Sequence, residues 1–413
     1  MKIAEVSPVY ANRRRRLAEA IGDAVAVVPT APERVRNRDS HYPYRFDSHF
    51  YYLTGFTEPE AALVVTEQKS VLFCRERNEE REIWDGFRHG PAAARERFGF
   101  DEAHPIAKLD EEMARLLENR PALYYPMGAD AQWDARAIGW LNAVRARVRA
   151  GIAAPERMHD VRAVIDDMRL VKDAHELGVM RRAARIAAAA HRRAMQRTRP
   201  GRYEYEIEAE LLHEFRRNGA QFPAYSPIVA GGANACVLHY VANDALLRDG
   251  DLLLIDAGCE LDGYASDLTR TFPVNGRFSA AQREVYEVVL AAQRAALESV
   301  RPGNAWNEPH DAAVKALAQG LIELKLLPGT LPEVIEKETY KRFYMHRTGH
   351  WLGLDVHDAG DYKRQGNWRA LAPGMVLTVE PGLYIRAADD IPERLRSIGI
   401  RIEDDVLVTE AGC

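Results

Sequence analysis

Charged and polar residues interrupt five apolar, strand-like stretches in the C-terminal part of this 413-residue chain. The stretches are LLLIDAG (252–258), SDLTRTF (266–272), GHWLGLDVH (349–357), MVLTVEPGLY (375–384) and GIRIEDDV (399–406). An ionised carboxylate that is buried without a partner costs several kcal/mol. Each stretch therefore has to supply its charge with a counter-ion, and this requirement constrains the fold more than any other feature.

One residue of each stretch fits a shared metal site, and the set is Asp256, Asp267, His350, Glu380 and Glu403. Four carboxylates around one divalent ion leave surplus negative charge in a buried pocket, whereas two divalent ions balance them. Oxygen ligands with one imidazole and no thiolate favour Mn, with Co, Fe or Zn as alternatives. The five residues together predict a dinuclear hydrolytic centre.

The dipeptide Asp262-Gly263 predicts a tight hairpin turn between the first two stretches. As a two-residue loop, it would place Gly258 opposite Asp267, with Asp256 as the diagonal neighbour of Asp267 on the same face. Diagonal neighbours are roughly 7–8 Å apart, within the span of two carboxylates bridged by metal. The local sequence thus predicts that the two aspartates meet.

Three further histidines, His239, His346 and His357, belong to the same part of the sequence, and two of them flank His350 closely. A single His on an apolar face is usually structural, but this clustering favours a functional role. Imidazoles near a metal-activated water can hold a substrate carbonyl or stabilise an oxyanion. Neither HELGV (175–179) nor HEFRR (213–217) has the second His of a zinc helix.

The chain length predicts two domains, which we place at residues 1–165 and 166–413. In the first domain, apolar runs alternate with helical segments, which predicts an α/β arrangement. These runs are AVAVV (24–28), AALVV (61–65), SVLFC (70–74) and ALYYP (122–126). The stretch 149–169 is expected to be the crossover between the domains.

The second domain is expected to begin with two helices, one from Asp173 to Pro200-Gly201 and one ending near Gly219. Strands carrying the polar residues follow, then another helical pair at 279–327 and further strands. This order favours an internal two-fold repeat.

A net charge of −5 gives no reason to expect nucleic acid or an anionic membrane as a partner. No apolar run approaches the ~20 residues that span a bilayer. Glu19 and Asp23 interrupt the only stretch that resembles a signal-peptide core. The four cysteines include no close pair, so neither a zinc knuckle nor a disulfide framework is indicated. These features predict a cytoplasmic protein.

The polar stretches resemble the motifs of the pita-bread metallopeptidases, and across the whole chain those of the Xaa-Pro aminopeptidases (aminopeptidase P). LIDAGCELDGYASDLTRTFPV resembles the two-Asp motif, HWLGLDVHD the His motif, and MVLTVEPGLYI and GIRIEDDVLVTE the two Glu motifs. RNRDSHYPYRFDSHFYYLTGFTEPEAALVV resembles the N-terminal domain. The resemblance implies an α/β N-terminal domain followed by an α+β pita-bread catalytic domain with a pseudo-two-fold repeat.

Carried onto this chain, the resemblance implies a role for each ligand. Asp256 would bind one metal, Asp267 and Glu403 would bridge both, and His350 and Glu380 would complete the opposite side.

The other site residues follow from the same motifs. His239 would lie over the scissile carbonyl, His357 on the substrate peptide and His346 in the proline pocket. Tyr384 and Arg401 would form an outer pair, with Arg401 offsetting carboxylate charge.

Positions in the N-terminal domain match less specific parts of the family pattern. Asp39 and Arg149 correspond to substrate-pocket residues, and Trp84 to a residue lent by a neighbouring subunit, so a homo-oligomer (dimer or tetramer) is expected. The chain departs from the family at Arg347, which replaces the usual Gly after His346 and gives HRTGH. That departure bears on the shape of the proline pocket.

The sequence therefore predicts an Xaa-Pro aminopeptidase, an exopeptidase that releases the first residue from peptides with proline in the second position. Two divalent ions would hold a bridging hydroxide that attacks the Xaa-Pro bond, with Glu380 as proton shuttle. The alternatives are a prolidase, which acts on Xaa-Pro dipeptides, and a non-catalytic pita-bread binding protein. Creatinase, which lacks the metals, fits less well because all five ligands are present.

Overall fold

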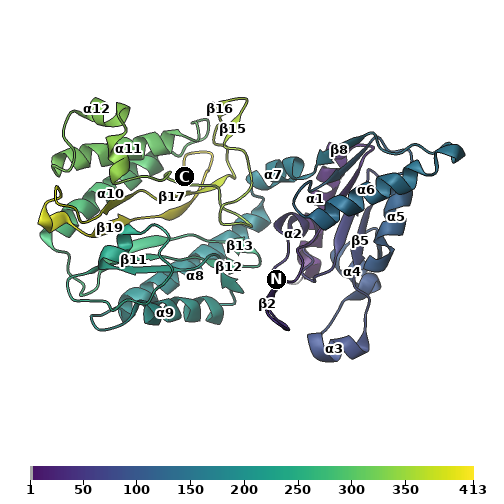
Figure 1. The fold of residues 1–413 in the computed structure, drawn as a ribbon, viewed down its shortest axis with the longest axis horizontal. Helices are drawn as coiled ribbons and strands as arrows, with labels where there is room; N and C mark the ends of the chain where they lie inside the picture. Colours follow the sequence, from purple (N-terminus) through teal and green to yellow (C-terminus); the bar gives the residue numbers. More distant parts are fainter. Residues whose placement is uncertain (1–2) are drawn as a thin grey trace. The chain divides into compact units, whose positions relative to one another are not determined.

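The computed structural model describes residues 3–413, with side chains described from residue 8. The chain divides into two compact units, Met1–Arg169 and Leu170–Cys413 (Figure 1). No helix among the described residues is long and apolar enough to cross a membrane.

The N-terminal unit contains a six-stranded sheet in the order β6-β5-β4-β1-β7-β8. Its strands are β1 (Val25–Pro29), β4 (Ala62–Val65), β5 (Ser70–Cys74), β6 (Glu102–Pro105), β7 (Ala122–Tyr125) and β8 (Arg157–Asp160). The β1–β4 and β4–β5 pairs are antiparallel, and the other three pairs are parallel. The four predicted apolar runs form β1, β4, β5 and β7, so that prediction is confirmed.

The stretch 149–169 differs from its prediction as a simple crossover. Residues Arg157–Asp160 pair in parallel with β7 and form the edge strand β8. The sequence of β8, RMHD, has no apolar run, because an edge strand is less enclosed than a central one. The hydrophobic pattern therefore gave no signal for it.

Helices surround this sheet, and a small hairpin projects from the unit. The elements are α1 (Ile3–Ile21), α2 (Ser48–Thr54), α3 (Glu79–Asp85), α4 (Gly90–Phe98), α5 (Leu109–Leu116), α6 (Ala131–Arg145), α7 (Arg162–Leu170), β2 (Val35–Asn37) and β3 (Ser40–His41).

The C-terminal unit has the predicted order of paired helices and strands. Its helices are α8 (Ala174–Arg197), α9 (Glu204–Arg217), α10 (Ala280–Ser299), α11 (Glu308–Glu323) and α12 (Leu331–Glu336). Asp173 caps α8 in a reciprocal arrangement with Glu176, and Gly219, with φ +90°, follows the end of α9. In Figure 1 β11, β17 and β19 lie between α8–α9 on one side and α10–α12 on the other.

The strands between these helices are short and carry the polar residues. They are β9 (Phe222–Pro223), β10 (Ile228–Gly231), β11 (Leu252–Asp256), β12 (Cys259–Leu261), β13 (Tyr264–Ala265), β14 (Thr269–Pro273), β15 (Lys363–Arg364), β16 (Asn367–Trp368), β17 (Val376–Val379), β18 (Gly382–Ile385), β19 (Ile398–Arg401) and β20 (Asp404–Leu407).

The first two polar stretches form one antiparallel hairpin with a single register. In β12–β13 Leu261 pairs with Tyr264, and in β11–β14 Asp256 pairs with Thr269, so no residue is inserted between the two ladders. Asp262 and Gly263 have φ values of 49° and 82°, as a two-residue type I′ turn requires. The predicted hairpin is confirmed.

The last two polar stretches form a second hairpin of the same kind. Val379 pairs with Asp404 in β17–β20, and Gly382 pairs with Arg401 in β18–β19. This shared register places Glu380 opposite Glu403, at the point where the ladder is interrupted. An isolated bridge between Thr269 and Glu403 joins this hairpin to the first one.

The stretch 349–357 was expected to be strand-like, and this expectation is wrong for most of its length. Only Trp351 forms a β-bridge, to Leu377, and the following residues form bends. The His350 carbonyl accepts the Thr378 N–H at 2.9 Å. The segment is therefore fixed along β17 without being a regular strand.

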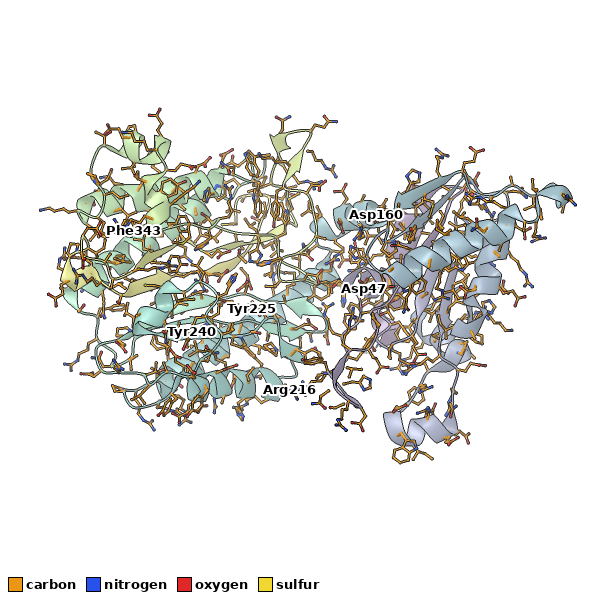
Figure 2. The ribbon with its side chains drawn as sticks, viewed as in Figure 1. Asp47, Asp160, Arg216, Tyr225, Tyr240 and Phe343 are labelled. Atoms are coloured by element: carbon orange, nitrogen blue, oxygen red, sulfur yellow. The ribbon has the colours of Figure 1, made fainter. Side chains whose placement is uncertain are left out.

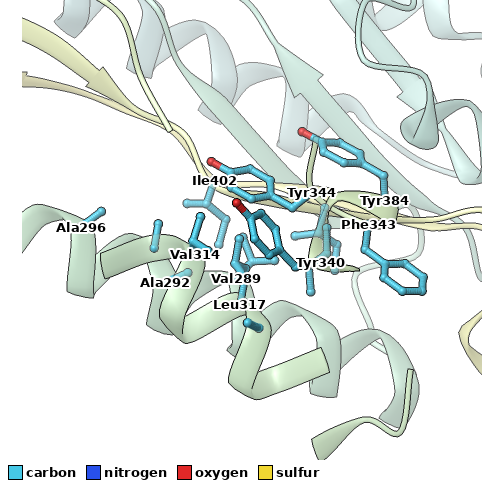
Figure 3. Close-up of a cluster of buried hydrophobic side chains, with 14 of the residues drawn as sticks. Val289, Ala292, Ala296, Val314, Leu317, Tyr340, Phe343, Tyr344, Tyr384 and Ile402 are labelled. Atoms are coloured by element: carbon cyan, nitrogen blue, oxygen red, sulfur yellow. The ribbon is translucent and has the colours of Figure 1, made fainter. Parts of the chain in front are cut away.

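A large apolar core packs α10 and α11 against the second hairpin. Figure 3 shows Val289, Ala292 and Ala296 of α10 and Val314 and Leu317 of α11 beneath a group of aromatic side chains. That group consists of Tyr340, Phe343, Tyr344 and Tyr384. The core thus supports Tyr384 from below, next to the strand that carries Arg401.

Candidate metal centre

A cavity of about 1050 Å³ opens within the C-terminal unit. The residues that line it include all five predicted ligands together with His239, His346, His357 and Arg401. Residues as far apart in the sequence as Tyr225 and Glu403 thus share one concave surface.

His350 lies among the carboxylates in an orientation suited to a metal ligand. Its Nε2 is 3.5 Å from Asp267 Oδ2 and 3.7 Å from Glu380 Oε1. Its Nδ1 carries the proton and donates a hydrogen bond to the Trp351 carbonyl oxygen, 2.9 Å away. The hydrogen bond leaves the Nε2 lone pair free to face a cation. Asp267, His350 and Glu403 each offer an atom, and these atoms lie within 4.8 Å of one another.

Tyr225, which is labelled in Figure 2, contacts both aspartates of the first hairpin. Its hydroxyl donates to Asp256 Oδ1 at 2.5 Å and makes a second short contact with Asp267 Oδ1. A hydroxyl has a single proton to donate, so Tyr225 can donate to only one of the two carboxylates at a time. Asp256 and Asp267 therefore lie close enough to share one ligand.

Threonine hydroxyls orient the two glutamates of the second hairpin. Thr269 Oγ1 donates to Glu403 Oε2 at 2.6 Å. Thr378 Oγ1 lies 3.3 Å from Glu380 Oε1 and also accepts the His350 N–H at 3.1 Å. These contacts leave the remaining carboxylate oxygens to face the cavity.

A chain of hydrogen bonds runs from the ligands to His346. Arg401 Nη2 donates to Asp256 Oδ2 at 2.6 Å, and Arg401 Nη1 donates to the Tyr384 hydroxyl at 2.9 Å. The Tyr384 hydroxyl is 2.8 Å from His346 Nε2, while His346 Nδ1 is 2.7 Å from the Arg347 carbonyl oxygen. Because that carbonyl can only accept, Nδ1 carries the proton and Nε2 accepts from Tyr384.

Burial disfavours the charged form of the acids at this site. Desolvation raises the pKa of Asp267 well above its usual range, with a further contribution from Asp256. It raises the pKa of Glu403 in the same way, with Asp267 adding to the effect, and raises the pKa of Glu380 to about 8. Burial lowers the pKa of His346 to about 4. Negative charge is thus in excess here.

The donor set fits divalent cations. Carboxylate oxygens and one neutral imidazole are ligands for Mn, Zn, Co or Fe. Arg401 is the one cation bonded to a proposed ligand, at Asp256, among the ion pairs of the described residues. A single guanidinium cannot balance four carboxylates, so the site accommodates further positive charge.

His239 and His357 lie exposed on the cavity wall. The His350 and His357 rings meet edge to face with centroids 4.4 Å apart. Partial desolvation of the His357 ring at the cavity wall, together with the neighbouring His350, lowers the pKa of His357. A neutral imidazole is thereby favoured beside the proposed metal ligand.

The three predicted residues of the N-terminal unit belong to separate exposed elements. Asp39 lies between β2 and β3, Trp84 is 80% exposed on α3, and Arg149 lies in a short 3₁₀ helix at Val148–Ala150. The structure does not bring these three together within their unit, and their roles stay predictions.

Sequence reasoning missed two residues at the centre, Tyr225 and Asp405. Asp405 accepts the Asp267 N–H at 3.1 Å, and burial raises its pKa well above the usual range. Its place two residues after Glu403, on the same face of the strand, is a signal that could have found it. Tyr225 has no such local signal.

Comparison with known proteins gives a consistent result for both units. Residues 178–410 match the profile of metallopeptidase family M24, and residues 10–124 match the aminopeptidase P N-terminal domain. The Xaa-Pro aminopeptidase of Escherichia coli (strain K12) is 46% identical over 409 residues, covering 98% of this chain and 92% of that protein.

Solved structures show the same fold. Pseudomonas aeruginosa aminopeptidase PepP has a TM-score of 0.97 and 50% identity, covering 98% of this chain and 93% of that one. A Zn-substituted E. coli aminopeptidase P in complex with product has a TM-score of 0.95 and 45% identity, with the same coverage. The predicted fold, an α/β N-terminal domain followed by a pita-bread catalytic domain, is confirmed.

Proposed function

This chain belongs to metallopeptidase family M24, and we propose that it is a dinuclear exopeptidase that releases the N-terminal residue from peptides with proline in the second position. The observation that carries the proposal is the single cavity that gathers four carboxylates, His350 and the bonded series Arg401–Tyr384–His346. The names of the similar proteins agree with this reading.

Two divalent ions complete the proposed site, and oxygen-rich ligands favour Mn. Asp256, Asp267, His350, Glu380 and Glu403 would hold the ions; Asp267 and Glu403 would be shared by both, Asp256 would hold one, and His350 and Glu380 would hold the other. When bound, the ions supply Lewis acidity that activates water and polarises the scissile carbonyl.

Glu380 is the proposed proton carrier. Its Oε1 lies 3.7 Å from His350 Nε2 and its Oε2 3.8 Å from His346 Nδ1, between the ligand cluster and the histidine-lined wall. From there Glu380 takes a proton from the attacking water and passes it to the nitrogen of the departing proline.

The surrounding side chains orient the substrate. Tyr384 and the Arg347 carbonyl fix the ring of His346, which borders the proposed proline pocket. His239 and His357, on the cavity wall, are placed to hold the scissile carbonyl and the peptide beyond it. Arg401 fixes Asp256 and Tyr384 and is a positioning residue.

A dedicated enzyme suits this bond for a physical reason. Proline has no amide N–H and a fixed φ, so peptidases that grip an extended backbone through that N–H do not bind it. The apolar rings of Trp306, Tyr362 and Trp368 on the cavity wall suit a substrate recognised by shape instead.

Three finer features of the proposal involve the rest of the molecule. Asp39 and Arg149 are proposed substrate contacts, and Trp84 a contact supplied across subunits of a homo-oligomer, dimer or tetramer. Light scattering of the purified protein tests the oligomer. A cytoplasmic location stays a prediction.

The decisive experiment compares Ala-Pro-Ala, Ala-Pro and Ala-Ala-Ala as substrates, with and without added Mn. Release of free alanine from Ala-Pro-Ala, dependent on metal and absent with Ala-Ala-Ala, supports the proposal. Faster cleavage of Ala-Pro than of the tripeptide would instead identify a prolidase. No cleavage of any peptide by the metal-loaded protein would identify a non-catalytic relative.

A further inference from the structure

Two cations lie against the same aromatic ring in the cavity wall. The Arg347 guanidinium carbon is 5.2 Å from the centre of the Trp368 ring, and Lys363 Nζ is 4.0 Å from it. Arg347, Lys363 and Trp368 all line the cavity that holds the proposed ligands.

The short hairpin β15–β16 presents Lys363 to this ring. Lys363 pairs directly with Trp368 and therefore shares a face of the hairpin with it, while Arg364 pairs with Asn367 on the opposite face. Arg347 approaches the ring from the loop before His350, where its Nη2 bonds to Asn307 Oδ1. Two elements of the chain thus converge on one indole.

Neither cation has a carboxylate partner within 4 Å in the part of the chain that the structure describes. By contrast, the cavity's third cation, Arg401, is bonded to Asp256. Two uncompensated positive charges in a concave, ring-lined site focus a positive potential that attracts an anion. A guanidinium and an ammonium are also the donors that bind carboxylates most strongly.

The distance along the chain limits where such an anion belongs on a substrate. Arg347 is three residues from His350, a separation of at most about 11 Å along the backbone. The carboxylate of a tripeptide lies two residues beyond the scissile bond, a span of about 7 Å. With the length of the Arg347 and Lys363 side chains added, that carboxylate is within reach of the two cations.

We propose that Arg347 and Lys363, held against Trp368, form a subsite for the C-terminal carboxylate of short Xaa-Pro-Xaa peptides. The inference rests on the proposed function and deepens it, since it names short peptides with a free C-terminus as the preferred substrates. An acidic side chain at the third position offers the same chemistry, and the experiment has to separate the two sources.

The test measures kcat/KM for Ala-Pro-Ala, its C-terminal amide, and Ala-Pro-Asp-amide at low salt. The wild-type protein is expected to prefer the free acid over the amide by about ten-fold or more. Removing either charge, with Arg347→Met or Lys363→Met, lowers that ratio, and removing both brings it within about two-fold of unity. Added salt should also lower the acid-to-amide ratio, because these side chains are solvent-accessible and their charges are screened.

Arg364→Met is the matched control. It removes one positive charge from the same hairpin, on the face away from Trp368, and should leave the acid-to-amide ratio unchanged. Metal content and the thermal midpoint of each variant establish that it is folded. The ratio is measured within one protein, so a general loss of activity in the Arg347 variant cancels.

Three outcomes overturn the subsite. The first is an acid-to-amide ratio near unity in the wild type, and the second is a ratio that survives in the double variant. Equal loss in the Arg364 variant, the third, would indicate a general field effect. A gain for Ala-Pro-Asp-amide with none for the free acid would reassign the subsite to an acidic side chain. Cleavage of the amide by all variants would still uphold the proposed function, whereas no cleavage of any peptide would refute it.

Discussion

Lys172 and Asp358 form an ion pair closed off from solvent, with Nζ 2.9 Å from Oδ2 and side-chain exposures of 0% and 1%. The pair connects the segment before α8 to the turn that follows His357. Its backbone is fixed at both ends, because the Lys172 N–H donates to the Gly374 carbonyl and the Asp358 N–H to the Trp351 carbonyl. It therefore holds the loop from His350 to His357 in place.

Replacing Lys172 with Met should destabilise the protein by about 3–5 kcal/mol, because it removes one member of a buried ion pair and leaves the other in place. Urea unfolding measures the effect. The double variant Lys172→Met/Asp358→Asn should lose less than the single one, since the charge of Asp358 is removed together with that of Lys172. Arg182→Met breaks an ion pair of similar length with Asp262 that is largely exposed, and should cost at most about 1 kcal/mol. Equal losses in the buried and exposed variants would contradict this account.

Tyr225→Phe should weaken the metal-free protein more than the metal-loaded one. Without the hydroxyl, the Asp256–Asp267 pair loses one hydrogen-bond donor, which costs about 1.5–3 kcal/mol for a bond to a charged group. Bound cations take over that role, so the gain in thermal midpoint on adding Mn should be larger in the variant. An identical gain in both proteins would show that the hydroxyl does not stabilise the acids.

Asp267→Ala and Glu403→Ala should each abolish activity and lose both metals, because each residue is proposed to bridge the two ions. Elemental analysis and peptide hydrolysis decide the matter together. Asp262→Asn is the control, since it lies in the turn of the same hairpin, with φ 49°, a conformation that Asn adopts readily. Two ions retained by an active Ala variant would remove this assignment.

The metal-free protein should lose stability as the pH rises above about 6.5. Burial raises the pKa of Glu380 to about 8. The protonated carboxyl therefore contributes fully to the stability of the fold below its unfolded pKa, and this contribution is lost as the pH rises past about 8. Burial lowers the pKa values of His310 and His346 to about 4. These two residues make stability increase with pH, but only up to their unfolded pKa of about 6.5, so they do not affect the slope above it.

Thermal midpoints in EDTA between about pH 6.5 and about pH 8 isolate the carboxyl effect. Glu380→Gln removes one of the carboxyls with a raised pKa and should reduce the slope, and added metal should abolish or reverse it, because the ligands bind as carboxylates. A metal-free wild type whose midpoint is constant over this range would contradict the prediction.

The local sequence was sufficient to predict those parts of the site whose geometry is set within a single hairpin. Asp262-Gly263 has the turn chemistry that sets the register, and the register brings Asp256 to Asp267. The apolar runs likewise located the central strands of the N-terminal sheet. In each case the deciding contacts lie within a short stretch of chain.

Contacts between segments that are distant in the sequence have no local sequence pattern, so they could not be predicted in this way. Tyr225 reaches the aspartates because β9 pairs with β12, and its YSP surroundings resemble an ordinary loop. The partnership of Lys172 with Asp358 joins residues 186 positions apart. His350 was expected in a strand, yet it is fixed by backbone bonds to β17 at the edge of the second hairpin.

Because the first hairpin has a single register, the number of residues between Asp256 and the turn decides which face of the hairpin its carboxylate lies on. Side chains alternate between faces along a strand, so one residue inserted between Asp256 and the turn would send that carboxylate to the opposite side of the ribbon. Lengthening both strands by two residues would keep both acids facing the cavity but move the turn outward. Changes in the length of the two strands between the acids and the turn therefore keep this geometry only when they come in even, matched steps.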